Sequence, residues 1–364
     1  MCRGIKSTNT QNSDLALGLN AVVLAVTNDQ PRVLTVSTRG IETISSAEPL
    51  HALPFGSFDM NQDRTLELCM RRSVFEQTHK DLGYVEQLYT FADKGRDPRE
   101  RLGGNRVVSI GYLALAQEQH FDVSGSSSWG NCFDYFPWED WRSGRPDVID
   151  EIESDLFNWS KSSSELRERV EICFGLGDVS WDAYKVLERY ELLYEAKMIP
   201  EFWIDSGKTS ENQIFERLGK PMAFDHRRIL ATGLSRVRGK LRYRPVVFEL
   251  LPETFTLFQL QQVAEALTGL QLHKQNFRRQ IEHSGLVEGT GTNNQNTRGR
   301  PVPPQETRER TGQDQQHRRD QPARLTERGE ENCGKHQRRD QPDAGGQAVH
   351  VVEEIERVCN PNHP

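Results

Sequence analysis

The sequence lacks any run of about 18 apolar residues, the length a helix needs to cross a bilayer, so we expect no membrane span. Its first segment, MCRGIKSTNTQNSD, has no apolar core of the secretory kind. Six cysteines are scattered over 364 residues without a CxxC pair, so neither a disulfide framework nor a structural zinc site is signalled. These absences predict a cytoplasmic protein with reduced thiols, no metal and no other cofactor.

Apolar residues are also scarce, at 35% of the chain. From residue 289 to residue 343 the only apolar side chains are Val302, Ala323, Leu325 and Cys333. That stretch is rich in Gln, Arg, Pro and Gly, as disordered segments are. We therefore expect residues 292–364 to form a disordered tail and the remainder to hold two domains.

Charge is segregated along the chain. Residues 139–216 contain 19 Asp/Glu against 9 Lys/Arg, whereas residues 225–285 contain 5 against 10. This division suggests that only the second region faces a polyanion, although a solvated basic surface without a partner is the alternative.

The region up to about residue 120 predicts a mixed α/β domain. Residues 17–26 and 32–37 are β-branched and flank the turn Asn28-Asp29-Gln30-Pro31, which predicts a hairpin. A helix is predicted by apolar residues at helical spacing: Leu66, Met70, Val74 and Phe75. YVEQLYTF and NRVVSIGYLALA predict two further strands.

Residues 141–216 predict an acidic helical insertion. VIDEIESDLFNWS, SSELRERVEICFG and WDAYKVLERYELLYEA each place apolar residues three or four apart, opposite acidic ones. Its aromatic residues are expected to belong to the core rather than to a ligand site: Trp181, Tyr184, Tyr190 and Tyr194.

The basic region ends in a predicted helix-turn-helix. Thr256 and Gln259 fit a capping box, and Gly269 ends the first helix. Phe277 and Ile281 form the buried face of a second helix over residues 274–283, and LVEGTG predicts the first strand of a wing. The residues expected to contact DNA are the polar ones of this second helix and wing: Lys274, Gln275, Asn276, Arg278, Arg279, Arg298 and Arg300.

The segment LPFGSFDMNQDRTLELCMRRSVFEQTHK resembles a Nudix box, whose glutamates hold magnesium against a diphosphate. Gly56 matches the loop glycine and Arg72 the arginine of that box. Ser73 and Gln77 replace two of its glutamates, and only Glu76 remains. One carboxylate is a poor magnesium site, so we expect a diphosphate pocket with weak or absent hydrolysis and no catalytic residue.

The resemblance extends over residues 15 to 291. GYVEQLYTFADKGRDPRE, RVVSIGYLALA and FDHRRILATGLSRVRGKLRYRPVVFELLPETF are similar to the NrtR-like, Nudix-related transcriptional regulators of NAD metabolism. Within that group, LPFGSFD and the acidic insertion that begins PWEDWRSGRP resemble the alphaproteobacterial branch called NadQ.

This resemblance implies a homodimeric repressor that binds double-stranded operator DNA of NAD biosynthesis genes. Its effector would be an adenine nucleotide: NAD, ATP or ADP-ribose. The residues expected to bind that ligand are Gly56, Arg72, Glu76, Arg96, Arg99 and Arg106. For any single arginine among them, a surface ion pair is the alternative.

The expected fold class is α+β. A Nudix-like α/β/α domain covers residues 1–224 with the insertion at 141–216, a winged helix-turn-helix covers 225–291, and the tail follows. Family members continue the wing into a short apolar segment, which this sequence replaces, so we expect nothing after Arg300 to complete the wing. The rival function is a Nudix hydrolase of ADP-ribose or a related nucleotide diphosphate, in which Glu76 and either Glu67 or Asp63 hold a metal.

Overall fold

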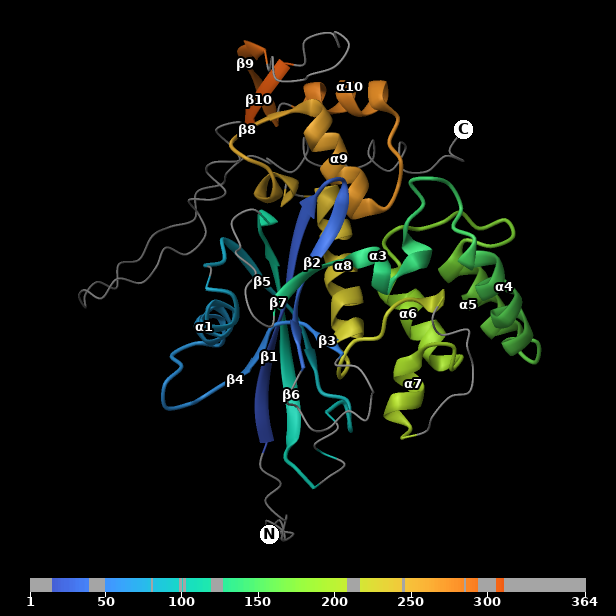
Figure 1. Cartoon of the computed structure of the whole chain (residues 1–364). Helices are drawn as coiled ribbons and strands as arrows, with labels where there is room; N and C mark the ends of the chain where they lie inside the picture. The colour runs from blue at the N-terminus through green and yellow to red at the C-terminus, as the bar shows by residue number, and fades with distance from the viewer. Residues whose placement is uncertain are drawn as a thin grey trace, which may run out of the picture. The chain divides into compact units, whose positions relative to one another are not determined.

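The computed structural model describes residues 15–38, 50–79, 81–97, 100, 103–118, 127–207, 217–243, 246–284, 286–293 and 306–310 (Figure 1). The chain divides into two compact units, one of residues 1–140 and 145–236 and one of residues 141–144 and 237–364. Within the described part, no helix is both long enough and apolar enough to span a membrane.

The first unit is built on a mixed sheet of seven strands. They are β1 (Leu15–Thr27), β2 (Gln30–Ser37), β3 (His51–Ala52), β4 (Phe55–Ser57), β5 (Tyr84–Phe91), β6 (Arg106–Leu115) and β7 (Ser127–Asn131). The order is β3-β2-β1-β6-β5, with β4 paired to β1 and β7 to β2. Only β1 and β6 run parallel.

The predicted hairpin is confirmed. β1 and β2 pair antiparallel with Thr27 opposite Gln30, so the turn is the two residues Asn28 and Asp29. Both have positive φ, of 51° and 61°, as a two-residue turn matching the strand twist requires. Asn and Asp tolerate this left-handed conformation better than other residues with a Cβ.

Helices cover both faces of the sheet (Figure 1). On one face α1 (Leu66–Thr78) buries Cys69, Met70 and Val74 in a cluster with alternate residues of β1. Phe75 is 45% exposed, so the apolar stripe of this helix ends at Val74. On the other face α8 (His226–Tyr243) lies so close to β1 that a Cβ on Gly233 would be 2.7 Å from Cγ1 of Val22.

The predicted insertion is helical. It follows α3 (Cys132–Tyr135) and the 3-10 turn η2 (Pro137–Glu139), and comprises α4 (Val148–Trp159), α5 (Ser164–Phe174), α6 (Val186–Glu195) and α7 (Pro200–Asp205). The third helix begins at Val186, not near Trp181 as its periodicity suggested, because the Asp182 side chain accepts from the Tyr184 N–H in a turn. Tyr190 is buried, whereas Trp181, Tyr184 and Tyr194 are half-buried.

The second unit contains the predicted helix pair. Its elements are η4 (Val246–Leu250), β8 (Thr254–Thr256), α9 (Leu257–Thr268), α10 (Lys274–Ser284), β9 (Val287–Asn293) and β10 (Glu306–Arg310). The capping box of Thr256 and Gln259 is present, and Gly269 ends α9 with a φ of 71°. Trp141, at the start of the insertion, joins this unit through its N–H, which donates to the Gly269 carbonyl at 2.7 Å.

The expectation that nothing after Arg300 completes the wing is wrong. β10 pairs antiparallel with both β9 and β8, in the order β8-β10-β9. The sequence of β10, ETRER, has no alternation of apolar and polar residues and therefore does not predict a strand. A strand can still form there, because the hydrogen bonds of a ladder join backbone groups and do not depend on apolar side chains. The winged-helix sheet therefore extends beyond residue 291, and residues 294–305 and 311–364 of the expected tail lie outside the described part.

Candidate functional site: a basic helix and a buried pocket

The second helix of the helix pair, α10, separates its apolar and polar residues cleanly. Phe277 and Ile281 are buried, at 6% and 7% exposure. The predicted DNA contacts Lys274, Gln275, Arg278 and Arg279 are exposed, and Asn276 is half-buried. The structure thus brings these five residues onto the accessible part of one helix, while Arg298 and Arg300 lie outside the described residues.

The exposed cations of α10 differ in their ion pairing. The Arg278 guanidinium donates from Nε to Glu282 Oε1 at 3.0 Å, one turn along the helix. The first turn of α10 contains no acidic residue, so the positive end of the helix dipole is unopposed there. The amino end around Lys274 is therefore the part of this helix best suited to a phosphate.

A pocket of about 310 Å³ opens in the first unit beside the parallel pair β1 and β6. Its lining comes from β1, β4, β6, the loop after β5 and the start of α8: Ala16 to Asn20, Phe55 to Ser57, Arg96, Asp97, Gly104, Asn105, Val107, Ser109, Phe224 and His226. Gly18, Gly56 and Gly104 give backbone access to a ligand. At Gly56 a Cβ would lie 2.1 Å from the Ser73 hydroxyl oxygen, so that position accepts only glycine without rearrangement.

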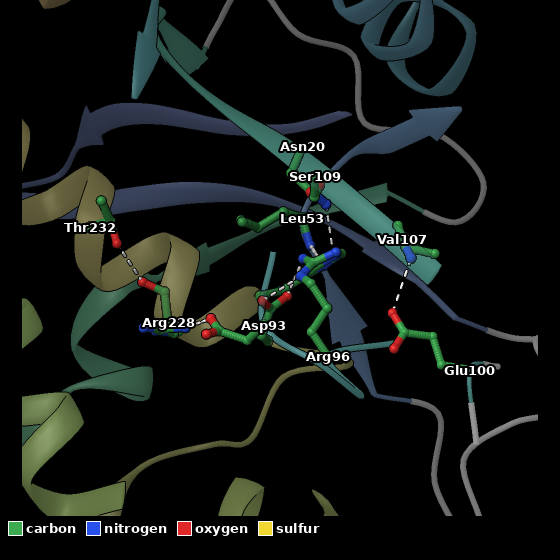
Figure 2. A network of polar contacts seen from close by, with 11 residues as sticks. Asn20, Leu53, Asp93, Arg96, Glu100, Val107, Ser109, Arg228 and Thr232 are labelled. Carbon is green, nitrogen blue, oxygen red and sulfur yellow. Dashed lines mark hydrogen bonds and ion pairs between the residues drawn. The ribbon is translucent and has the colours of Figure 1, made fainter. Parts of the chain in front are cut away.

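The imidazole of His226 is held at the pocket by hydrogen bonds to Leu53 and Asn20, two residues labelled in Figure 2. Its Nδ1 accepts from the Leu53 N–H at 3.0 Å, and its Nε2 lies 2.8 Å from the Asn20 amide. Because Nδ1 is an acceptor, the ring proton belongs on Nε2, and Asn20 accepts it when the oxygen of its amide, rather than the nitrogen, faces the ring. Ser109 hydrogen-bonds to the same amide.

Aromatic rings surround this imidazole. The Phe55 and Phe224 ring centroids lie 5.7 and 5.1 Å from that of His226, and 5.9 Å from each other. Burial, together with the nearby Arg96 cation, lowers the pKa of His226 to about 3. The pocket thus offers a neutral, largely apolar wall suited to a flat heterocycle.

This buried histidine predicts acid sensitivity of the first unit. The unfolded chain protonates His226 near its ordinary pKa of about 6.5, while the folded chain resists until about pH 3, so stability falls as pH decreases below 6.5. We expect protonation of His226 in the unfolded chain to lower the free energy of unfolding by about 2 kcal/mol between pH 7 and pH 5. Urea unfolding at both pH values should show the stability difference between wild type and His226→Gln shrinking by that amount.

The matched control for this experiment is the exposed His273. The unfolding of His273→Gln is measured at the same two pH values, so that the effect of losing a buried imidazole is compared with that of losing an exposed one. A stability difference between wild type and His226→Gln that stays constant from pH 7 to pH 5 would show that the ring is not held neutral.

Arg96 supplies the cation of the pocket, next to the lining carboxylate of Asp97, and it is already paired. Its Nε donates to Asp225 Oδ2 at 2.8 Å and its Nη2 to Oδ1 at 2.5 Å, and the two side chains are 6% and 12% exposed. Glu100 fixes the loop that carries Arg96, because its carboxylate accepts from the N–H groups of Gly95 at 2.8 Å and Val107 at 3.0 Å. Figure 2 shows Arg96 between the Asn20–Ser109 pair and the Asp93–Arg228 pair.

Of the residues predicted to bind the ligand, the structure brings only Gly56 and Arg96 together at this pocket. Arg72 and Glu76 lie on α1, where Arg72 pairs with Asp63 at 2.8 Å and with Glu76 at 3.5 Å. Arg106 is exposed and donates to the Ala92 carbonyl at 2.8 Å. Arg99 lies outside the described residues.

The carboxylates named for the rival hydrolase each have an arginine partner. Asp63 and Glu76 face Arg72, and Glu67 accepts from Arg71 at 2.9 Å. Among the described residues, no group of three or more His, Cys, Asp or Glu is placed to hold a metal ion.

Sequence reasoning missed most of the pocket. Asn20, Phe55, Phe224, Asp225 and His226 were not singled out. The last three lie in FDHRRIL, a segment that carries the family resemblance, so that segment is the signal that could have pointed to them. Asn20 and His226 are 206 residues apart, and nothing local links them.

Comparison with known proteins gives a family match within the second unit. Residues 247–302 match the family described as "NrtR DNA-binding winged helix domain". A curated relative, the ADPR responsive transcriptional repressor NtrR of Acinetobacter baylyi, is 25% identical over 243 residues, which are 66% of this chain. The match spans 62% of that relative, less than two thirds of its length.

Two solved structures are similar. NrtR of Shewanella oneidensis complexed with a 27mer DNA is 21% identical, with a TM-score of 0.47, over 81% of this chain and 93% of the other. The NUDIX domain of the same protein complexed with ADP ribose is 27% identical, with a TM-score of 0.27, over 33% and 75%. The family match and the architecture above confirm a mixed α/β domain with helices on both faces of its sheet, followed by a winged helix.

Proposed function

We propose that this chain is a transcriptional repressor that binds operator DNA through its winged helix and responds to a nucleotide bound in the first unit. The observation that carries this proposal is the exposed basic face of α10, within a segment that matches a DNA-binding winged helix. A helix that buries Phe277 and Ile281 while exposing Lys274, Arg278 and Arg279 has the design of a recognition helix.

In this proposal α10 enters the major groove. Lys274, Arg278 and Arg279 contact phosphates, and Gln275 and Asn276 are the amides able to read base edges. Arg298 and Arg300 contact the backbone or minor groove from the wing. A homodimer binds a palindromic operator, since two recognition helices must meet half-sites about one helical turn apart.

The proposed effector site is the pocket of the first unit. An adenine ring fits the wall formed by Phe55, Phe224 and His226, and Arg96 is the cation nearest to a diphosphate there. NAD, ATP and ADP-ribose share these two features. ADP-ribose is favoured because the curated relative is named as ADPR responsive.

The operators proposed are those of NAD biosynthesis genes, as in the family that the sequence resembles. The NadQ branch rests on LPFGSFD and on the acidic insertion. A fragment from upstream of these genes, with its control of random sequence, is therefore the DNA to use in any binding assay.

The proposal also predicts the outcome of a hydrolysis assay. Because Glu76 is exposed and pairs with Arg72, its loss should not alter turnover. We expect ADP-ribose with magnesium to be hydrolysed at the same low background rate by wild type and Glu76→Gln, measured as AMP released. Robust turnover by the wild type that the variant loses would instead support the Nudix hydrolase.

A further inference from the structure

The cation of the effector pocket is neutralised from within the protein. Arg96 gives two parallel hydrogen bonds to the Asp225 carboxylate, a geometry that matches the two groups atom for atom. Arg96 also lines the pocket. A phosphate that enters therefore competes with Asp225 for one guanidinium.

Asp225 belongs to the start of α8. Its carbonyl accepts from the Ile229 N–H at 3.1 Å, so it is the residue from which the helix begins. The next residue, His226, lies in the pocket, and Arg228 pairs with Asp93 and Glu191. The first turn of α8 is thus attached to the pocket through His226, which lines it, and through the pair of Asp225 with the lining residue Arg96.

The same helix continues into the winged-helix unit. The division between the two units falls inside α8, after Arg236. Beyond it, Arg238 donates from Nε to the Leu267 carbonyl at 2.8 Å, at the end of α9. A change at the first turn of α8 is therefore a change in a helix that also hydrogen-bonds to the end of α9.

Separating the Asp225 carboxylate from Arg96 is energetically unfavourable for the folded protein. Burial raises the pKa of this carboxyl group and the Arg96 cation opposes that effect, so the charged form depends on its partner. A buried carboxylate without a partner strongly destabilises the folded state. Movement of Asp225 out of its buried position would remove this unfavourable free energy.

On the basis of the proposed function, we propose that an anionic effector binds by taking Arg96 from Asp225, and that the release of Asp225 is the event that α8 carries to the winged helix. Asp225 is then a positioning residue, which couples the two functions without contacting DNA.

The test is Asp225→Asn. Asn is as good a helix N-cap as Asp, so α8 should still begin there. Without the competing charge, ADP-ribose should bind about tenfold more tightly by calorimetry, the size of one charge-assisted hydrogen bond. Operator affinity, measured with and without ADP-ribose, should differ less than twofold in this variant.

Glu191→Gln is the matched control. Glu191 lies on α6 and pairs with Arg228 of the first turn of α8 rather than with Arg96 or Asp225, so both measurements should stay within twofold of wild type. If wild type binds ADP-ribose and Asp225→Asn binds it equally and still responds on DNA, the inference is overturned while the proposed function stands. If wild type neither binds nor responds, the proposed function itself fails.

Hydrogen exchange on the wild type gives a readout that needs no variant. Addition of ADP-ribose should speed amide exchange in the first turn of α8, including the Ile229 N–H that bonds to Asp225. Unchanged or slower exchange in that turn would contradict release of Asp225.

Discussion

Replacing Glu139 by alanine is expected to destabilise the first unit by about 3–5 kcal/mol, because it leaves the Arg189 guanidinium as a buried charge without its partner. Both side chains are fully buried. Arg189 donates from Nε and Nη2 to the two Glu139 carboxylate oxygens at 2.6 and 3.0 Å.

The rest of the Arg189 environment amplifies this effect. Its Nη1 donates to the carbonyls of Cys173 at 3.0 Å and Asp182 at 2.8 Å, and the guanidinium lies 3.8 Å above the Trp181 ring. One side chain therefore joins η2, the end of α5 and the turn before α6. Truncating Glu139 therefore weakens the contacts of Arg189 that hold these parts of the insertion together.

Urea unfolding followed by circular dichroism measures this loss. The control is Glu195→Ala, which breaks the half-exposed pair with Arg169 and should cost about 0–1 kcal/mol. A cost for Glu139→Ala no larger than that of the control would mean that the insertion does not depend on this buried pair.

The second large effect concerns DNA. Lys274→Ala combined with Arg279→Ala should weaken operator binding about 100-fold at low salt and reduce the slope of log affinity against log salt by about 2, since two phosphate contacts are lost. Arg278→Ala alone should cost less, because Arg278 already shares its charge with Glu282.

Fluorescence anisotropy of a labelled operator, repeated over a salt series, provides the measurement. The control combines Arg64→Ala with Lys161→Ala, two exposed cations of the first unit, so the net charge of the chain changes equally. Equal losses in the two double variants would show that only net charge matters and that α10 does not contact DNA.

The parts of the fold that the sequence predicted are those with local causes. The Asn28-Asp29 turn, the Thr256–Gln259 capping box and the glycine end of α9 each depend on residues a few positions apart. The burial of Phe277 and Ile281 follows from helical spacing alone. The exposed polar residues of α10, which we propose contact DNA, could be found for the same reason.

The effector pocket could not be found in this way. It is assembled by β1, β4, β6, one loop and the start of α8, so its members meet only once the sheet has formed. Arg72 and Glu76 matched a familiar motif, yet in the structure Arg72 pairs both with Glu76 and with Asp63. β10 was missed because a strand held in the middle of a small sheet by backbone pairing needs no apolar pattern.

The central claim is that one chain couples DNA binding to a nucleotide. The most direct test is a gel shift of the upstream region of NAD biosynthesis genes with the full chain, titrated in parallel with NAD, ATP and ADP-ribose. We expect the affinity for this region to be well above that for a random duplex. We also expect ADP-ribose to change that affinity about tenfold, within the usual range of allosteric coupling. Equal affinity for both duplexes, with no response to any of the three nucleotides, would contradict it.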